Sequence, residues 1–169
     1  MRYYFDTEFM EDGVTIDLVS IGVVDETGRE FYMESADADL TIANKFVREH
    51  VTPLLQGGEY RRPRSMIRDK LFEFVAAGSD DGLKPEFWAW YGAYDWVALC
   101  QIFGRMVDLP NGWPMHHMDL KQLCIQVGNP EVPEQKTQKH HALNDAKHAK
   151  ALHAWLAFGR DWGQELGAH

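Results

Sequence analysis

The sequence predicts an α/β fold in which a mixed central sheet of five strands is flanked by helices. Three apolar runs near the N-terminus are joined by short turns, which is typical of an antiparallel meander. Further along, two more strand-like runs alternate with helical patterns, which indicates helices packed on the faces of the sheet. A single domain is expected over residues 1–169, because this length suits one core and no linker-like stretch divides the chain.

The meander strands are expected at residues 2–8, 16–24 and 30–35. The first begins with an aromatic run, and the second is mostly β-branched and apolar, which is the pattern of a central strand. Turn residues separate them, at Glu11-Asp12-Gly13 and again at Glu26-Thr27-Gly28. The third strand carries more polar residues and is expected to be more exposed.

Apolar residues at helical spacing account for most of the remaining chain. Helices are expected at residues 40–51, 65–77, 95–104, 119–127 and 141–158. The two further strands are expected at residues 86–91 and 114–118. Connections rich in Gly, Pro and polar residues are expected at residues 56–64, 79–82 and 128–139.

The charge balance narrows the classes of function. The chain has 17 basic and 26 acidic residues, a net charge of -9, which argues against a protein held on nucleic acid by a broad basic surface. An enzyme that binds phosphates through metal ions is still allowed. Cys100 and Cys124 lie in apolar helical patterns and are expected as core thiols. No signal peptide or membrane-spanning run is seen, so we expect a cytoplasmic protein without a membrane partner.

Two acids on the first strand are the first candidate functional residues. Side chains alternate faces along a strand, so Asp6 and Glu8 point the same way and Thr7 points the opposite way. Two carboxylates beside an apolar strand repel each other and resist burial. A bound cation would offset both costs.

Two more acids stand at the heads of helices. Asp95 begins a stripe that continues through Ala98, Leu99, Ile102 and Phe103, and Asp145 begins one that continues through Ala149, Leu152 and Leu156. Each acid alone has a structural explanation, as a helix N-cap for Asp95 and as a partner of the helix dipole for Asp145. A shared site for divalent cations would explain all four acids together.

The histidines offer a base. His140 lies five residues before Asp145 and would project over the same site, where a neutral imidazole can take a proton from water. Its neighbour His141 competes for this role. Adjacent His116 and His117 point to opposite faces of a strand, so with Asp119 they are expected to be structural rather than a second metal site.

The acids and the histidine stand in short motifs that resemble a known superfamily. Phe5-Asp6-Thr7-Glu8, Tyr94-Asp95 and the run from His140 to Ala146 resemble the DEDDh exonucleases of the DnaQ-like, ribonuclease H-like superfamily. Residues 4–9, 21–24 and 88–101 are more similar to the polyadenylate-specific exoribonuclease AS family. Many superfamily members carry Asn-Ala where this chain has Tyr91-Gly92-Ala93, which weakens the analogy to DNA proofreading subunits.

The resemblance implies a ribonuclease H-like fold and a metal-dependent 3′-to-5′ exoribonuclease. By position, Asp6, Glu8, Asp95 and Asp145 would bind two Mg²⁺ or Mn²⁺ ions, and His140 would be the general base. The substrate would be single-stranded RNA, with a preference for adenylate, and the products nucleoside 5′-monophosphates released by a two-metal mechanism. Two alternatives stay open: an exonuclease on single-stranded DNA or very short oligonucleotides, and an RNA-binding module that has lost catalysis.

Two further expectations concern aromatic residues and assembly. Phe9 follows the acids directly and is a candidate for stacking on the terminal base, with core packing as the alternative. A homodimer is implied by the resemblance. Trp155, Phe158 and Trp162 would form one stripe if the last helix continues, which makes them candidates for a subunit contact.

Overall fold

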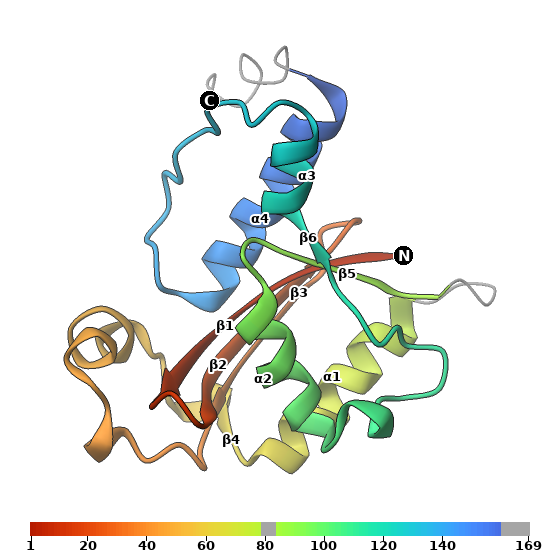
Figure 1. Cartoon of the computed structure of the whole chain (residues 1–169). Helices are drawn as coiled ribbons and strands as arrows, with labels where there is room; N and C mark the ends of the chain where they lie inside the picture. The colour runs from red at the N-terminus through yellow and green to blue at the C-terminus, as the bar shows by residue number, and fades with distance from the viewer. Residues whose placement is uncertain (79–83, 160–169) are drawn as a thin grey trace.

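The computed structural model describes residues 1–78 and 84–159, in which a six-stranded mixed sheet lies between helices (Figure 1). The strand order is β4-β3-β2-β1-β5-β6. The strands are β1 (Arg2–Glu11), β2 (Ile16–Asp25), β3 (Glu30–Ser35), β4 (Arg61–Arg62), β5 (Glu86–Ala89) and β6 (Met118–Asp119). The loop expected at 79–82 and the predicted stripe residue Trp162 lie outside the described residues.

The predicted meander is confirmed, because β1, β2 and β3 pair in antiparallel order. Strand β5 then joins β1 in parallel and β6 joins β5 in parallel, so β1 is a central strand. The sequence did not indicate β4, in which Arg61 and Arg62 pair with Glu34 and Ser35 of β3. A strand of two residues is too short to show a period-two pattern, which explains why residues 56–64 were expected to be a connection.

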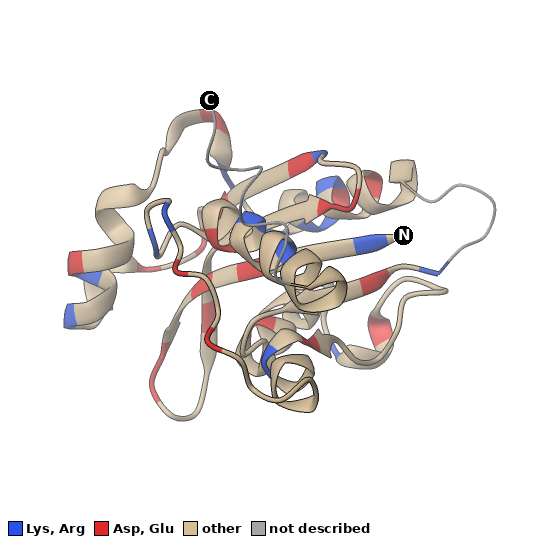
Figure 2. Cartoon of the chain, turned by 90° about the horizontal axis from the view of Figure 1, so that it is seen from above, with Lys and Arg blue, Asp and Glu red and all other residues tan. Residues whose placement is uncertain are grey.

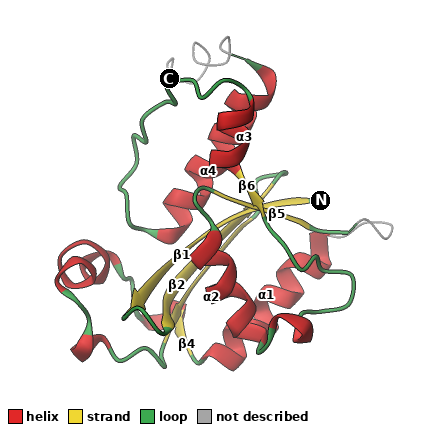
Figure 3. Ribbon diagram, in the orientation of Figure 1, coloured by secondary structure: helices red, strands yellow, loops and turns green. Residues whose placement is uncertain are grey.

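Within residues 1–78 and 84–159, four α-helices cover the two faces of the sheet, and Figure 3 shows how they are arranged. They are α1 (Arg64–Gly78), α2 (Ala93–Phe103), α3 (Leu120–Gln126) and α4 (Ala142–Phe158). Helices α1 and α2 bury an apolar core against Tyr3 and Phe5 of β1, whereas α3 and α4 pack on the opposite face against Tyr4. Asp119 caps α3 as predicted, since its Oδ1 accepts hydrogen bonds from two N–H groups of the first turn.

The helix predicted over 40–51 is confirmed only in its second half, where residues 45–51 are helical and Val47–Val51 form a π-helical turn, η2. Separate 3₁₀ turns lie before and after it, at Leu40–Ile42 and Thr52–Leu54. Asp39 Oδ1 accepts a hydrogen bond from Thr41 N, and Asn44 Oδ1 accepts one from Val47 N. At both places a side chain caps the start of a new turn, so the segment is divided into short turns. The apolar residues that suggested a helix are nevertheless buried, because Val47 and Val51 pack against the end of β1.

Three remaining expectations concern the thiols, the surface and the membrane. Cys100 and Cys124 are both buried and free, as predicted. Figure 2 shows Lys and Arg positions interspersed with Asp and Glu positions along the described part of the chain. None of the helices described is long and apolar enough to cross a membrane.

Candidate active site

The candidate site is a gap between two packed clusters on one face of β1. Tyr4 is buried beneath α4, and Met10 is buried beneath the segment that includes η2. Asp6 and Glu8 lie between them on the same face, and Glu8 is buried. The period-two alternation read from the sequence is therefore confirmed, and it delivers both carboxylates to the part of the face that neither cluster covers.

An irregularity in β2 lies directly beside Glu8. Glu8 pairs with Ser20 but Phe9 pairs with Leu18, so Val19 is an extra residue in β2. Such a bulge bends and twists the strand that carries it. Val19 turns into the cluster around η2, which brings that segment against the end of the sheet next to the acids.

Asp95 reaches the site from the first turn of α2. The N-cap of α2 is Gly92, so the capping role considered for Asp95 is wrong. Its Oδ1 instead accepts from Thr7 N at 2.8 Å and from Thr7 Oγ1 at 2.7 Å. Strand β5 ends its pairing with β1 at Tyr4, so the Thr7 N–H is free to bind the carboxylate. Thr7 thereby fixes one oxygen of Asp95.

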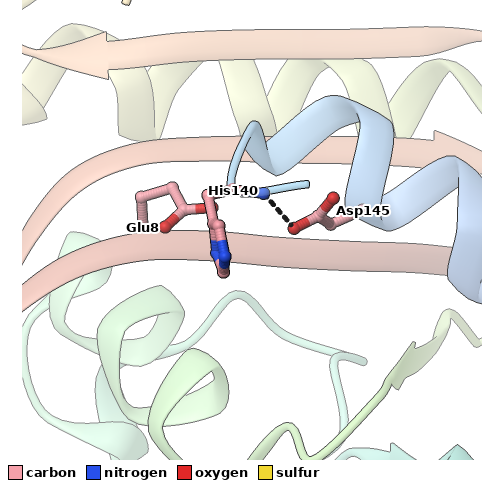
Figure 4. Close-up of side chains that lie close together, drawn as sticks. All are labelled: Glu8, His140 and Asp145. Atoms are coloured by element: carbon pink, nitrogen blue, oxygen red, sulfur yellow. Dashed lines mark hydrogen bonds between the residues drawn. The ribbon is translucent and has the colours of Figure 1, made fainter. Parts of the chain in front are cut away.

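Asp145 and His140 come from the start of α4 (Figure 4). The Asp145 Oδ2 atom accepts from His140 N at 3.0 Å, and its Oδ1 accepts from Gln135 Nε2 at 2.5 Å. His140 has a φ of 65°, a left-handed conformation that is uncommon outside glycine. The hydrogen bond to Asp145 stabilises this turn, which directs the chain from the preceding loop into the helix.

Gly22 allows α4 to lie this close to β1. It pairs with Asp6, and a Cβ atom at this position would lie 2.2 Å from Leu143 N and 2.3 Å from the carbonyl carbon of Ala142. The backbone of the first turn of α4 therefore rests directly on the backbone of β2. Only glycine permits this contact, since backbone atoms cannot turn aside as a flexible side chain can.

The structure separates the two adjacent histidines. Ligand atoms of Glu8, His140 and Asp145 all lie within 4.8 Å of one another. The His140 ring also contacts the rings of Phe46 and His50, with centroid distances of 5.0 and 5.8 Å. The geometry brings His140, rather than its neighbour, to the acids.

His141 has a different environment. It is the N-cap residue of α4, and its ring stacks on Tyr32 of β3 at 4.5 Å. Its Nε2 lies 3.1 Å from Nε2 of Gln56. The side chain therefore packs the start of α4 against the sheet.

The carboxylates strongly perturb one another. Desolvation, followed by the charges of Asp95, Glu8 and Asp145, raises the pKa of Asp6 well above its usual value. Desolvation and the neighbouring acids raise the pKa of Glu8 to about 8. Desolvation also raises the pKa of Asp95 to about 6, although the Thr7 hydrogen bonds oppose this shift. The charges of Asp95 and Asp145 thus act on both Asp6 and Glu8.

This cluster fits divalent cations. Desolvation and the charges of neighbouring acids raise the pKa of both Asp6 and Glu8, so a cation bound between these carboxylates would relieve their repulsion. Carboxylate oxygens are the ligands that hard cations such as Mg²⁺ prefer. His116, His117 and Asp119 form no comparable group within the described ranges, and Asp119 is occupied with capping α3 and binding Gly92 N.

The neighbours of the site differ in how clearly the sequence indicated them. Phe9, the predicted stacking residue, is partly buried, and its ring contacts that of Tyr94 edge to face at 5.9 Å, next to Asp95. Gly22 could have been noticed as a glycine inside a β-branched strand, a sign of close backbone approach. Gln135 gave no signal, because a polar residue in a polar loop looks like its neighbours.

Comparison with known proteins identifies the family. Residues 1–156 match the model of the Rv2179c-like 3′-5′ exoribonuclease domain. The chain belongs to this family. It is 46% identical over 149 residues to the 3′-5′ exoribonuclease Rv2179c of Mycobacterium tuberculosis strain H37Rv, across 87% of this chain and 88% of that protein. The same figures hold for the 3′-5′ exoribonuclease MT2234.1 of strain CDC 1551 / Oshkosh.

A solved structure shares the fold at much lower identity. It is described as showing 3′-end specific recognition of a histone mRNA stem-loop by a 3′-exonuclease. The match has a TM-score of 0.57 and 12% identity, and it covers 94% of this chain and 64% of that one. The ribonuclease H-like classification, the DEDDh type and the AS family stay predictions.

Proposed function

We propose that this protein is a metal-dependent 3′-to-5′ exoribonuclease of the DEDDh type, which removes nucleoside 5′-monophosphates from the 3′ end of single-stranded RNA. Membership of an exoribonuclease family supports the reaction class. The observation that carries the mechanism is the meeting of ligand atoms of Glu8, His140 and Asp145 within 4.8 Å, next to Asp6 and Asp95, whose charges interact.

Asp6, Glu8, Asp95 and Asp145 would hold two divalent cations, Mg²⁺ or Mn²⁺. Bound cations of this kind supply positive charge to the scissile phosphate and lower the pKa of water. Desolvation and the charges of the neighbouring acids raise the pKa of Asp6 and of Glu8, so positive charge between these groups relieves an existing electrostatic cost. Thr7 fixes Asp95 Oδ1 and leaves Oδ2 available as a ligand.

His140 acts as the general base in this proposal. It accepts the proton of the water that attacks the terminal phosphorus, while the bond from phosphorus to the 3′ oxygen of the preceding nucleotide breaks. The leaving oxygen takes a proton from solvent, which yields one nucleoside 5′-monophosphate and an RNA shortened by one residue. The rings of Phe46 and His50 hold the imidazole in place. Loss of a positioned base typically slows a reaction by about 10²–10⁴-fold.

The terminal nucleotide would lie beside the pair formed by Phe9 and Tyr94. Tyr94 is 52% exposed, so an aromatic face next to Asp95 is accessible to a base. Stacking on aromatic side chains tolerates every base, because each has a π-face. The preference for adenylate rests on the sequence resemblance alone, and so does the homodimer.

A substrate panel with product analysis tests the proposal. Purified protein is incubated with Mg²⁺, Mn²⁺ or EDTA and with poly(A), mixed-sequence RNA, dinucleotides or single-stranded DNA, each labelled at the 3′ end. Release of labelled 5′-monophosphate from RNA only with a cation is the expected result. Faster release from DNA or dinucleotides would favour the alternative exonuclease. No release from any substrate would indicate an RNA-binding module.

Variants of the candidate site accompany the panel. Asp6→Ala and Asp145→Asn should abolish release while the circular dichroism spectrum is unchanged. Retained activity in both variants would contradict the metal site.

A further inference from the structure

A long connection, here called the strap, leads from α3 to α4. We use this name for residues 129–139, which contain no helix or strand (Figures 1 and 3). In Figure 1 this segment arches away from α4 before it returns to the start of that helix. A cavity of about 570 Å³ lies between them, lined by Pro133 and Thr137 of the strap and by Lys147, Ala151 and Trp155 of α4. The strap is therefore not packed closely along the helix.

One side chain fastens the middle of the strap. Among the hydrogen bonds of the described residues, the only one that joins residues 131–137 to the rest of the fold runs from Gln135 Nε2 to Asp145 Oδ1, at 2.5 Å. Other contacts of the Gln135 amide stay within the strap, to Thr137 Oγ1 and to Gln138 O. Gln135 is also less exposed than the residues on either side of it.

The acceptor of this bond is a candidate metal ligand. The Asp145 Oδ2 atom is already held by His140 N, so Gln135 holds the second oxygen and prevents the carboxylate from rotating. Side chains that hydrogen-bond a metal-binding carboxylate orient it, and their loss typically weakens metal binding by about 10–100-fold.

We propose that Gln135 is a positioning residue that fastens the strap to Asp145 and holds this carboxylate in the orientation that cation binding requires. The part about cations rests on the proposed function, whereas the part about the strap rests on the contact alone. Coupling of two equilibria is reciprocal. A cation that immobilises Asp145 therefore also stabilises the hydrogen bond that holds the strap.

Gln135→Met separates these effects, because methionine has a similar length but no N–H donor. The matched control is Gln138→Met on the same strap, where the side chain makes no hydrogen bond among the described residues. Each protein is digested with trypsin in EDTA, and cleavage after Lys136 and Lys139 is timed by mass spectrometry. Gln135→Met should be cleaved about threefold to tenfold faster than the wild type and the control, because loss of one hydrogen bond opens the strap.

The same proteins are titrated with Mn²⁺ by calorimetry. Gln135→Met should bind about 10–100-fold more weakly than the wild type, and Mn²⁺ should slow cleavage at Lys136 in the wild type but not in this variant. Equal cleavage rates of both variants in EDTA would overturn the strap contact. Equal Mn²⁺ affinities would overturn the positioning role. Because digestion in EDTA needs neither a cation nor RNA, its result stands even if the protein proves not to be a nuclease.

Discussion

Gly22→Ala is the sharpest test of how the fold assembles the site. A Cβ atom at this position would lie 2.2 Å from Leu143 N, and the shortfall from an ordinary contact of 3.4 Å is about 1.2 Å. The opposing atoms belong to backbone, so the clash is relieved only if the first turn of α4 moves from β2 or β2 itself bends. Asp145 and His140 are fixed to this turn and would move with it.

The expected effect on catalysis exceeds the effect on stability. Forcing an extra methyl group into a packed contact costs about 1–3 kcal/mol, which a domain of this size can tolerate. A displacement of about 1 Å between Glu8 and Asp145, by contrast, can cost about 10²-fold in rate, because the reacting groups lose alignment. We therefore expect a folded variant with kcat lowered at least about 30-fold.

The assay compares release of mononucleotide with thermal unfolding for the same preparations. Gly13→Ala is the control, since Gly13 has a φ of 84° and nothing within 4 Å of its virtual Cβ. This control carries a backbone strain of about 1–2 kcal/mol but leaves α4 in place. If Gly22→Ala has a kcat within twofold of Gly13→Ala, the close contact does not position the site and the reasoning fails.

Three further predictions use other contacts of the site. Thr7→Val removes one of the two donors to Asp95 Oδ1, so calorimetry should show about tenfold weaker Mn²⁺ binding. The control Thr7→Ser keeps the hydroxyl and should bind Mn²⁺ like the wild type. Equal Mn²⁺ binding by both variants would refute the role of the hydroxyl. The raised pKa values of Glu8 and Asp95, about 8 and about 6, mean that the folded state without metal binds more protons than the unfolded state above about pH 4. In EDTA the free energy of unfolding should therefore fall between about pH 4 and pH 8, by about 3 kcal/mol for Asp95 alone. Mn²⁺ should raise the melting temperature more at pH 8 than at pH 5. A free energy of unfolding that does not change with pH in EDTA would contradict the raised pKa values of Glu8 and Asp95. His140→Ala should lower kcat about 10²–10⁴-fold, with Mn²⁺ binding retained to within about tenfold. His141→Ala should mainly lower the melting temperature, because the His141 ring packs on Tyr32. The reverse pattern would assign the role of the base to His141.

Much of the fold could be predicted because local patterns carry it. The three meander strands follow from apolar, aromatic and β-branched runs between turn residues, and the helices after residue 64 follow from apolar residues at helical spacing. Asp119 caps its helix as its residue type predicts. The single helix predicted over residues 40–51 is only half confirmed, because Asp39 and Asn44 divide the backbone hydrogen bonding into short turns before the helical residues 45–51. Apolar spacing shows that this segment is buried, but it does not show which backbone bonds the polar side chains replace.

The sequence by itself indicated which four acids are candidates for the site and that two of their side chains share one face of a strand. Asp6 and Glu8 share a face because side chains alternate along any strand, whatever surrounds it. Only the tertiary structure decided what meets them there. Asp95 is fixed by Thr7 at an edge that β5 leaves free, and Asp145 arrives because Gly22 lets the backbone of α4 rest on β2.

Only the tertiary structure could also decide whether His140 or His141 lies next to the acids. Adjacent residues are equivalent in a motif, and the φ of 65° at His140 sends one ring to the carboxylates and the next to Tyr32. Gln135 reaches the site for the same reason, through a contact with a residue ten positions later in the chain. Spacing along the chain sets local geometry, whereas contacts between distant segments depend on how closely backbones can pack, and that is resolved only in the folded molecule.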